Sequence, residues 1–447
     1  MDRTRDMTSG SPAGHILSFA LPLIITNIGQ QFYYIADASI VGRGIGVKAL
    51  AAVGSTDWVT WLILWSMIGL CQGFSTFVSR AFGEKDYAAM NRAIAVAARL
   101  CLVIGFVVTA AGLLAAKPVL RLLETPDELL PDAWAYLMII TAGTPIVTAY
   151  NMAASILRAV GDSKTPLIAM VIAAVLNISL DILFVFGFKW GVVGAAIASV
   201  LAQCVAFAYC FVRIGKTNCV AFDREAFLHG GRLGRDMLIF GIPIACQYII
   251  IGLSGIIVQS GVNVQGSAFI AGYTAPNKLY GLMECSAISL GLASSTFIAQ
   301  NYGAGEKMRV KRGVTASVGI ALLVSIGVAA FVLLLRRPLI LLFLDASEAG
   351  TAEAMHVAVY YLSIMALSLP ALYMIQVYRN TLQAMEISVW SMVSGIAECA
   401  LRAVMAKLVI NYIGTDALFL AEPVAWVGGM LSVMLPYYLW YRKNRLE

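Results

Sequence analysis

The chain has few charged residues. Asp, Glu, Lys and Arg make up only 13% of its 447 residues, whereas hydrophobic residues make up 60% and the mean hydropathy is +0.82. Soluble domains carry about 25% charged and about 45–50% apolar residues. This composition excludes a soluble enzyme, a nucleic-acid-binding protein and a disordered scaffold. The net charge of +6 does not alter this, because the basic residues lie in short clusters between long apolar runs.

Histidine and paired cysteine are scarce as well. The chain has three scattered histidines, and its eight cysteines form no CxxC motif. Zinc and thiol redox sites need clustered ligands or paired cysteines. No nucleophile motif is present either. We therefore expect neither enzymatic activity nor a cofactor.

Long apolar runs, by contrast, are abundant. A transmembrane helix needs about 20 mostly apolar residues, and twelve segments meet this requirement. They are residues 14–41, 56–79, 93–116, 133–157, 166–188, 191–212, 237–261, 272–299, 313–335, 355–378, 387–410 and 418–441. These runs lack the alternating polar pattern of a membrane β-barrel. The sequence predicts an all-α polytopic membrane protein with twelve transmembrane helices.

Lys and Arg are concentrated in alternate loops. With both termini placed in the cytoplasm, the inner loops and tails hold 20 of these residues and the outer loops hold 7. Cytoplasmic loops carry the excess of positive charge in membrane proteins. We predict a multi-pass protein of the cell (inner) membrane with both termini in the cytoplasm.

The two halves of the chain resemble each other. Pro22 in FALPLI matches Pro243 in FGIPIA, 221 residues later, and RAFGEKD (80–86) matches QNYGAGE (300–306). Six spans in each half give the copies the same orientation, as in transporters whose substrate site lies between two repeats. The expected organisation is an N-lobe at 1–212, a cytoplasmic linker at 213–236 and a C-lobe at 237–447 around a central cavity. Two lobes in one chain make a monomer sufficient.

Carboxylates inside the apolar spans are the strongest functional signal, because a charge at the centre of a transmembrane helix costs ~2.5–3.5 kcal/mol on insertion scales. Asn177 and Asp181 lie four residues apart in the fifth span, hence on one face, and Asp37 lies in the first span. Neighbouring buried carboxylates can load and release a proton near neutral pH. Their oxygens could also coordinate sodium. In the alternative interpretation, Asp37 reaches interfacial water and the other two side chains only join helices.

Further polar residues accompany these carboxylates. Several recur every three or four residues on the same stripe of the first span as Asp37, and one acidic residue of the eighth span has no obvious partner on its own helix. Glu398 and Arg402, four residues apart, have the spacing of an intrahelical ion pair. The candidates for a substrate cavity are Asn27, Gln30, Gln31, Tyr34 and Glu284.

Several motifs together resemble the multidrug and toxic compound extrusion (MATE) transporters. The segments that carry the resemblance are residues 19–43, 50–54 (LAAVG), 78–88 (VSRAFGEKDYA), 156–166 (ILRAVGDSKTP), 176–184 (LNISLDILF), 190–199 and 297–306 (FIAQNYGAGE). The resemblance implies two six-helix lobes that exchange protons or sodium for organic, often cationic, compounds by alternating access. In the prokaryotic branch, an acidic pocket of the first lobe binds the coupling ion. The residues that correspond to this pocket are Asp37, Tyr136, Asn151, Asn177 and Asp181.

The resemblance also implies a hinge in the first span, and the chain departs from one branch of the family in the seventh span. Pro22 matches a helix 1 proline proposed to bend with protonation. Another branch has a second-lobe cation site with a glutamate in the seventh span, but residues 248–257 (YIIIGLSGII) hold no acidic residue. Glu284 or Glu398 could substitute for that glutamate.

The predicted function is a cation-coupled antiporter, driven by protons or sodium, that exports organic cationic drugs or toxins. Its predicted partners are the lipid bilayer and small organic cations or amphipathic compounds, with no nucleic acid. A flippase for a lipid-linked or other amphipathic metabolite is the alternative. Such a flippase favours a strongly basic cavity, whereas the membrane-embedded charges here are mainly acidic.

Overall fold

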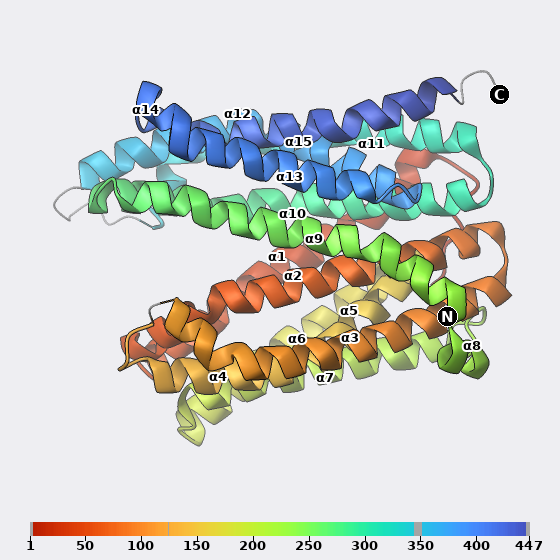
Figure 1. Ribbon diagram of the computed structural model, residues 1–447, viewed down its shortest axis with the longest axis horizontal. Helices are drawn as coiled ribbons and strands as arrows, with labels where there is room; N and C mark the ends of the chain where they lie inside the picture. Colours follow the sequence, from red (N-terminus) through yellow and green to blue (C-terminus); the bar gives the residue numbers. More distant parts are fainter. Residues whose placement is uncertain (1–2, 124, 344–350, 444–447) are drawn as a thin grey trace. The chain divides into compact units, whose positions relative to one another are not determined.

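The computed structural model describes residues 3–123, 125–343 and 351–443, and these are almost entirely helical (Figure 1). The helices in chain order are α1 (Pro12–Gly44), α2 (Val47–Glu84), α3 (Tyr87–Leu122), α4 (Leu130–Ala142), α5 (Thr144–Ala159), α6 (Lys164–Asp181), η1 (Ile182–Gly187), α7 (Gly191–Gly215), α8 (Arg224–His229), α9 (Gly231–Asn263), α10 (Ser267–Gly303), α11 (Lys307–Ile340), α12 (Thr351–Ala384), α13 (Val389–Val404), η2 (Met405–Val409), α14 (Ile410–Ile413) and α15 (Asp416–Lys443).

Each of the twelve predicted spans falls on helical structure, so the all-α polytopic prediction is confirmed. Ten helices among the described residues are long and apolar enough to cross a membrane, and the bent pair α4–α5 makes an eleventh. The remaining span, predicted at 387–410, is formed by α13, η2 and α14. It is broken into short pieces and carries three charged residues, Glu398, Arg402 and Lys407.

Two kinds of irregularity interrupt the spans. The bend of 44° between α4 and α5 lies at Gly143, just before Pro145 in the first turn of α5. Proline is tolerated in a first turn, where its missing N–H is not needed. α6 and α13 instead continue into π-helical segments, η1 and η2. Such segments are rare and occur frequently at functional sites.

The chain divides into two compact units. The first contains residues 1–6 and 25–245, and the second contains residues 7–24 and 246–447. Two helices therefore pass from one unit to the other, α1 after Ile24 and α9 after Ala245. Each has an internal proline just before this point, Pro22 in α1 and Pro243 in α9. Proline cannot donate to the carbonyl four residues earlier and weakens the helix there.

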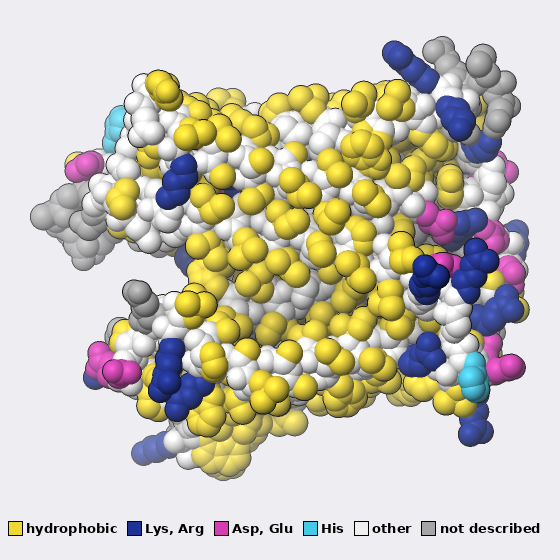
Figure 2. All heavy atoms as spheres, in the orientation of Figure 1, with side chains coloured by type: hydrophobic (Ala, Val, Ile, Leu, Met, Phe, Trp, Pro, Cys, Tyr) yellow, Lys and Arg dark blue, Asp and Glu magenta, His cyan; other side chains and the backbone are white. Residues whose placement is uncertain are grey.

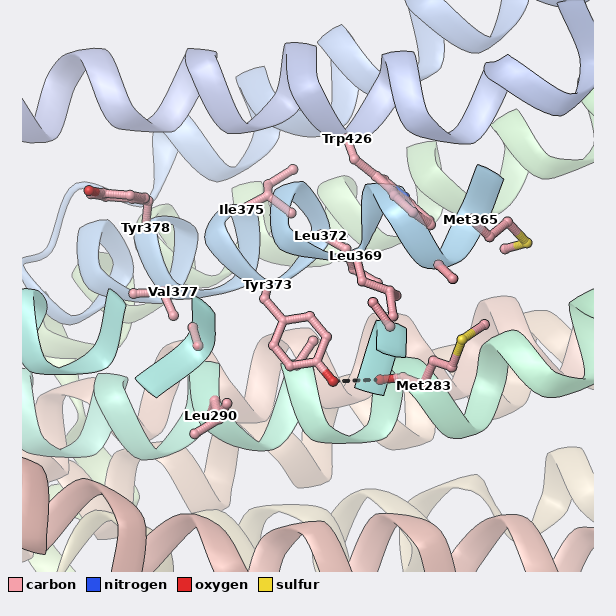
Figure 3. Close-up of a cluster of buried hydrophobic side chains, with 14 of the residues drawn as sticks. Met283, Leu290, Met365, Leu369, Leu372, Tyr373, Ile375, Val377, Tyr378 and Trp426 are labelled. Carbon is pink, nitrogen blue, oxygen red and sulfur yellow. Dashed lines mark hydrogen bonds between the residues drawn. The ribbon is translucent and has the colours of Figure 1, made fainter. Parts of the chain in front are cut away.

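Each unit has its own core. In the second unit, a large cluster of buried aromatic and aliphatic side chains lies between α10, α12 and α15, and includes the fully buried Trp426, Tyr361 and Tyr373. The Tyr373 hydroxyl donates to the Met283 carbonyl at 3.1 Å (Figure 3), which gives this buried polar group a partner. Apolar side chains also cover most of the face drawn in Figure 2, with charged side chains toward the helix ends, as expected for a protein embedded in lipid.

Candidate functional site

In the first unit, the carboxyl groups of Asp37 on α1 and Asp181 on α6 are in hydrogen-bonding contact. Asp181 is 1% exposed, and Asp37 is half-buried. Oδ1 of each carboxyl is buried and accepts no hydrogen bond from the described residues. The structure thus brings together two acidic residues that lie 144 positions apart in the sequence.

Asn177 links the carboxyl pair to α7. With its amide oriented to suit its neighbours, Asn177 donates to Asp181 Oδ2 at 2.8 Å and accepts from the Ser199 hydroxyl and backbone N–H, each at 3.2 Å. The Ser199 hydroxyl also lies 3.3 Å from the Tyr33 hydroxyl. A continuous polar network therefore runs from α1 through α6 to α7. We call Tyr33, Asp37, Asn177, Asp181 and Ser199 the carboxyl network.

Local helix geometry explains part of this arrangement. Asn177 and Asp181 are one turn apart on α6, and so are Tyr33 and Asp37 on α1, so that each pair shares a face. Asp181 is the last residue of α6 before the π-helical η1. The irregular turn thus begins directly at the carboxyl pair.

The two candidates in the predicted span 133–157 differ in their relation to this network. Tyr136 on α4 is buried, and its hydroxyl lies within electrostatic range of Asp37 and Asp181. Asn151 on α5 donates to the Val147 carbonyl of its own helix at 2.9 Å. No hydrogen bond among the described residues joins Asn151 to the carboxyl network.

The cavity candidates divide between the units. Gln30 on α1 donates to the Tyr34 hydroxyl at 3.1 Å, one turn before Asp37. Asn27 and Gln31 are half-buried on the same helix, in the first unit. Glu284 lies on α10 of the second unit, where its carboxyl interacts with the Tyr280 hydroxyl. Pro22 lies within α1, on the second-unit side of the crossing point.

The second unit contains a buried ion cluster, which we define as Arg379, Glu398, Arg402 and Glu422. Glu398 pairs with Arg379 of α12 and, at 3.5 Å, with Arg402 one turn along α13. Both carboxylate oxygens of Glu422 on α15 accept from Arg402, at 3.0 and 2.7 Å. The intrahelical pair predicted from the spacing of Glu398 and Arg402 is therefore confirmed, as part of a larger set.

Sequence reasoning missed four of these residues, namely Tyr33, Ser199, Arg379 and Glu422. Tyr33 carries a signal, since it lies four residues before Asp37, whereas Ser199 resembles any small residue in a packed helix. Arg379 directly follows the predicted span 355–378, so the sequence places it among the 20 basic residues of the inner loops and tails, whereas in the structure it is 4% exposed inside α12. The helix α12 continues past the predicted span to Ala384, and the charge of Arg379 is neutralised by Glu398.

Comparisons with known proteins extend these observations. The family model MatE matches the chain twice, at residues 22–183 and 243–408. Probable multidrug resistance protein YoeA of Bacillus subtilis is 26% identical over 439 residues, with 95% of this chain and 94% of that protein covered. Probable multidrug resistance protein YpnP of Bacillus subtilis is 32% identical over 307 residues, with 68% of each covered.

A solved structure shows the same fold. It is an outward-facing multidrug resistance MATE family transporter of the MOP superfamily, with a TM-score of 0.89 at 21% identity and 100% of both chains covered. The second family-model match begins 221 residues after the first, at Pro243 against Pro22, which agrees with the repeat in the sequence. From these two matches, which together cover most of the chain, we conclude that the protein belongs to the MatE family, the MATE transporters.

Proposed function

We propose that this protein is a cation-coupled antiporter that exports organic, cationic drugs or toxins by alternating access. The observation that carries the proposal is the contact between Asp37 and Asp181, supported by Asn177, inside a membrane-spanning unit. The relatives named multidrug resistance proteins support the substrate class. A transporter role also accords with the predicted absence of enzymatic activity.

The chemistry of the carboxyl pair suits reversible ion binding. Two carboxylates in direct contact cannot both be ionised without strong repulsion, so the pair holds one proton between its oxygens or a bound cation. The oxygens Asp37 Oδ1 and Asp181 Oδ1, which lack donors, are available to accept a further proton or to coordinate sodium. An organic cation competes for the same negative charge. Loading the coupling ion therefore favours release of the substrate.

Pro22 is the proposed hinge of this cycle. It lies on α1, about four turns before Asp37 on the same helix, close to the point where α1 passes from one unit to the other. A change of charge at Asp37 acts on the half of α1 that belongs to the first unit. The proline weakens the helix where that half begins.

The energetics depend on stoichiometry. Exchange of one proton for one monovalent cation moves no net charge, so the pH difference alone, ~1.4 kcal/mol per unit, drives it. Exchange of one proton for a neutral compound also draws on the membrane potential, ~2.3 kcal/mol per charge per 100 mV.

The membrane placement follows the distribution of basic residues. We propose an inner-membrane location with both termini in the cytoplasm and function as a monomer of two lobes. Arg379 and Lys311 are buried, and without them 18 of the basic residues remain in the inner segments against 7 in the outer ones. The excess of Lys and Arg in the inner segments therefore remains, as the cytoplasmic placement of these segments requires.

Transport into proteoliposomes tests the proposal. The purified chain is reconstituted, a proton or a sodium gradient is imposed, and movement of a fluorescent organic cation is followed with and without the ionophore that collapses that gradient. The proposal predicts gradient-driven movement that the matching ionophore abolishes. Movement of a fluorescent lipid-linked metabolite, with no gradient-driven movement of any organic cation, would instead support the flippase.

A further inference from the structure

The buried ion cluster of the second unit has balanced charges. Its two guanidinium groups face two carboxylates, and Arg379, Glu398 and Arg402 are each 4% exposed. Every carboxylate oxygen has a cationic partner within the cluster: Glu398 Oε1 contacts Arg379, Glu398 Oε2 contacts Arg402, and both Glu422 oxygens contact Arg402. No oxygen of this cluster is left for an added cation.

All three nitrogens of the Arg402 guanidinium group have hydrogen-bonding partners. Nε and Nη2 donate to the two oxygens of Glu422, Nη2 also faces Glu398, and Nη1 donates to the Ser254 hydroxyl at 3.0 Å. Bidentate Arg–carboxylate pairs are strong and geometrically specific. A buried arginine keeps its charge in proteins. Arg402 therefore behaves as a fixed positive charge.

The position of the cluster within the repeat is informative. In the first unit, Asp181 lies on the helix that continues into a π-helical segment, and its network extends to the next long helix, α7. In the second unit, Glu398 and Arg402 lie on the helix that continues into η2, and their cluster extends to α15. The two MatE matches cover α6 and α13 and end within the π-helical segments, at residue 183 in η1 and residue 408 in η2. The first copy has carboxyl oxygens without donors, whereas the second has arginines.

We propose that the guanidinium group of Arg402 takes the place of a bound cation beside Glu398 and Glu422. Because these carboxylates are already neutralised, the second unit binds no coupling ion, and ion coupling is confined to the carboxyl network of the first unit. The inference rests on the proposed function for the identity of the first site. For the second site it rests on the ion cluster alone. Arg402 is thus a specificity-determining residue that sets the number of coupling sites to one per chain.

Cation binding tests this inference without any transport. The background is the full chain with Asp37→Asn and Asp181→Asn, which removes the first site. Saturable ²²Na⁺ binding is measured at pH 8.5 against choline at constant ionic strength. The expected result is no saturable binding in this background, about one Na⁺ per chain after Arg402→Gln, and loss of that binding after Arg402→Gln with Glu422→Gln. Arg402→Lys, which keeps the charge, is expected to bind no Na⁺.

Two results would overturn the inference. The first is saturable Na⁺ binding in the background variant that Glu398→Gln or Glu284→Gln abolishes, since Glu284 lies within electrostatic range of Arg402. The second is a monodisperse Arg402→Gln variant that binds no Na⁺. If Arg402→Gln does not fold, Glu422→Gln in the otherwise unaltered chain gives a second measurement. Its number of coupling ions per exported cation is expected to equal that of the wild type, and a changed ratio contradicts the inference. Loss of coupling in Asp37→Asn alone bears on the proposed function and not on Arg402.

Discussion

Removal of the Ser199 hydroxyl tests the carboxyl network without altering any charge. In Ser199→Ala, Asn177 and Tyr33 lose the hydroxyl partner that each contacts, at 3.2 and 3.3 Å. A buried hydrogen bond contributes about 1 ± 0.5 kcal/mol net, and a partner left unsatisfied adds to the loss. We expect the free energy of unfolding, measured by denaturant titration in detergent micelles, to fall by about 2–3 kcal/mol. Proton-driven transport should also fall, because Asn177 keeps only the backbone N–H of residue 199 as its partner on α7 and holds Asp181 less firmly.

Ser179→Ala is the matched control for this substitution. The Ser179 hydroxyl lies on the exposed side of the same α6 helix that carries Asn177 and donates only to the Val175 carbonyl, at 2.8 Å. Its loss should change stability by less than about 0.5 kcal/mol. A double-mutant cycle of Tyr33→Phe and Ser199→Ala should give a coupling energy of at least about 0.5 kcal/mol. Equal effects of Ser199→Ala and Ser179→Ala, with no coupling in the cycle, would refute the network.

Two further predictions concern stability and motion. Glu398→Gln leaves a buried arginine without its charged partner and should lower the free energy of unfolding by about 3–5 kcal/mol. Glu84→Gln, in an exposed ion pair, should lower it by at most about 1 kcal/mol. Denaturant titration compares the two variants, and equal losses would show that the buried cluster does not stabilise the second unit. Pro22→Ala and Pro243→Ala, in the two helices that pass between the units, should each leave affinity for a fluorescent cation within about twofold and slow its transport at least about tenfold, because a regular helix resists bending more than a proline-containing one. Binding by fluorescence polarisation and flux in proteoliposomes separate the two effects, and unchanged flux in both variants would exclude the hinges.

The sequence predicts most of the helical architecture because the signal is local. Long apolar runs lie on every observed span, and the spacing of Asn177 and Asp181 predicts that they share a face. The contact between Asp37 and Asp181 is different in kind, because it requires α1 to lie against α6 in the first unit. No spacing within one helix contains that information, and it came from the resemblance to known transporters.

Other features have no local signature. A π-helical turn such as η2 takes up an additional residue without changing the apolar character of the run, so it is invisible in the hydropathy. Arg379 and Glu422 stand at or near the ends of predicted spans, where charged residues ordinarily meet water. In the structure Arg379 is buried and Glu422 is half-buried, and each depends on a partner 19 or 20 residues away from it on α13. A long-range ion cluster of this kind becomes recognisable only once the helices are placed.

The most direct test of the central claim is neutralisation of the carboxyl pair. Wild type, Asp181→Asn, Asp37→Asn and the distant control Glu84→Gln are compared in proteoliposomes, with movement of a fluorescent organic cation driven by a proton or a sodium gradient. We expect gradient-driven movement to be lost in both aspartate variants and kept in the control, and the gradient that drives the wild type identifies the coupling ion. Gradient-driven movement that survives both aspartate substitutions would contradict a coupling site at the carboxyl pair and place that site elsewhere in the chain.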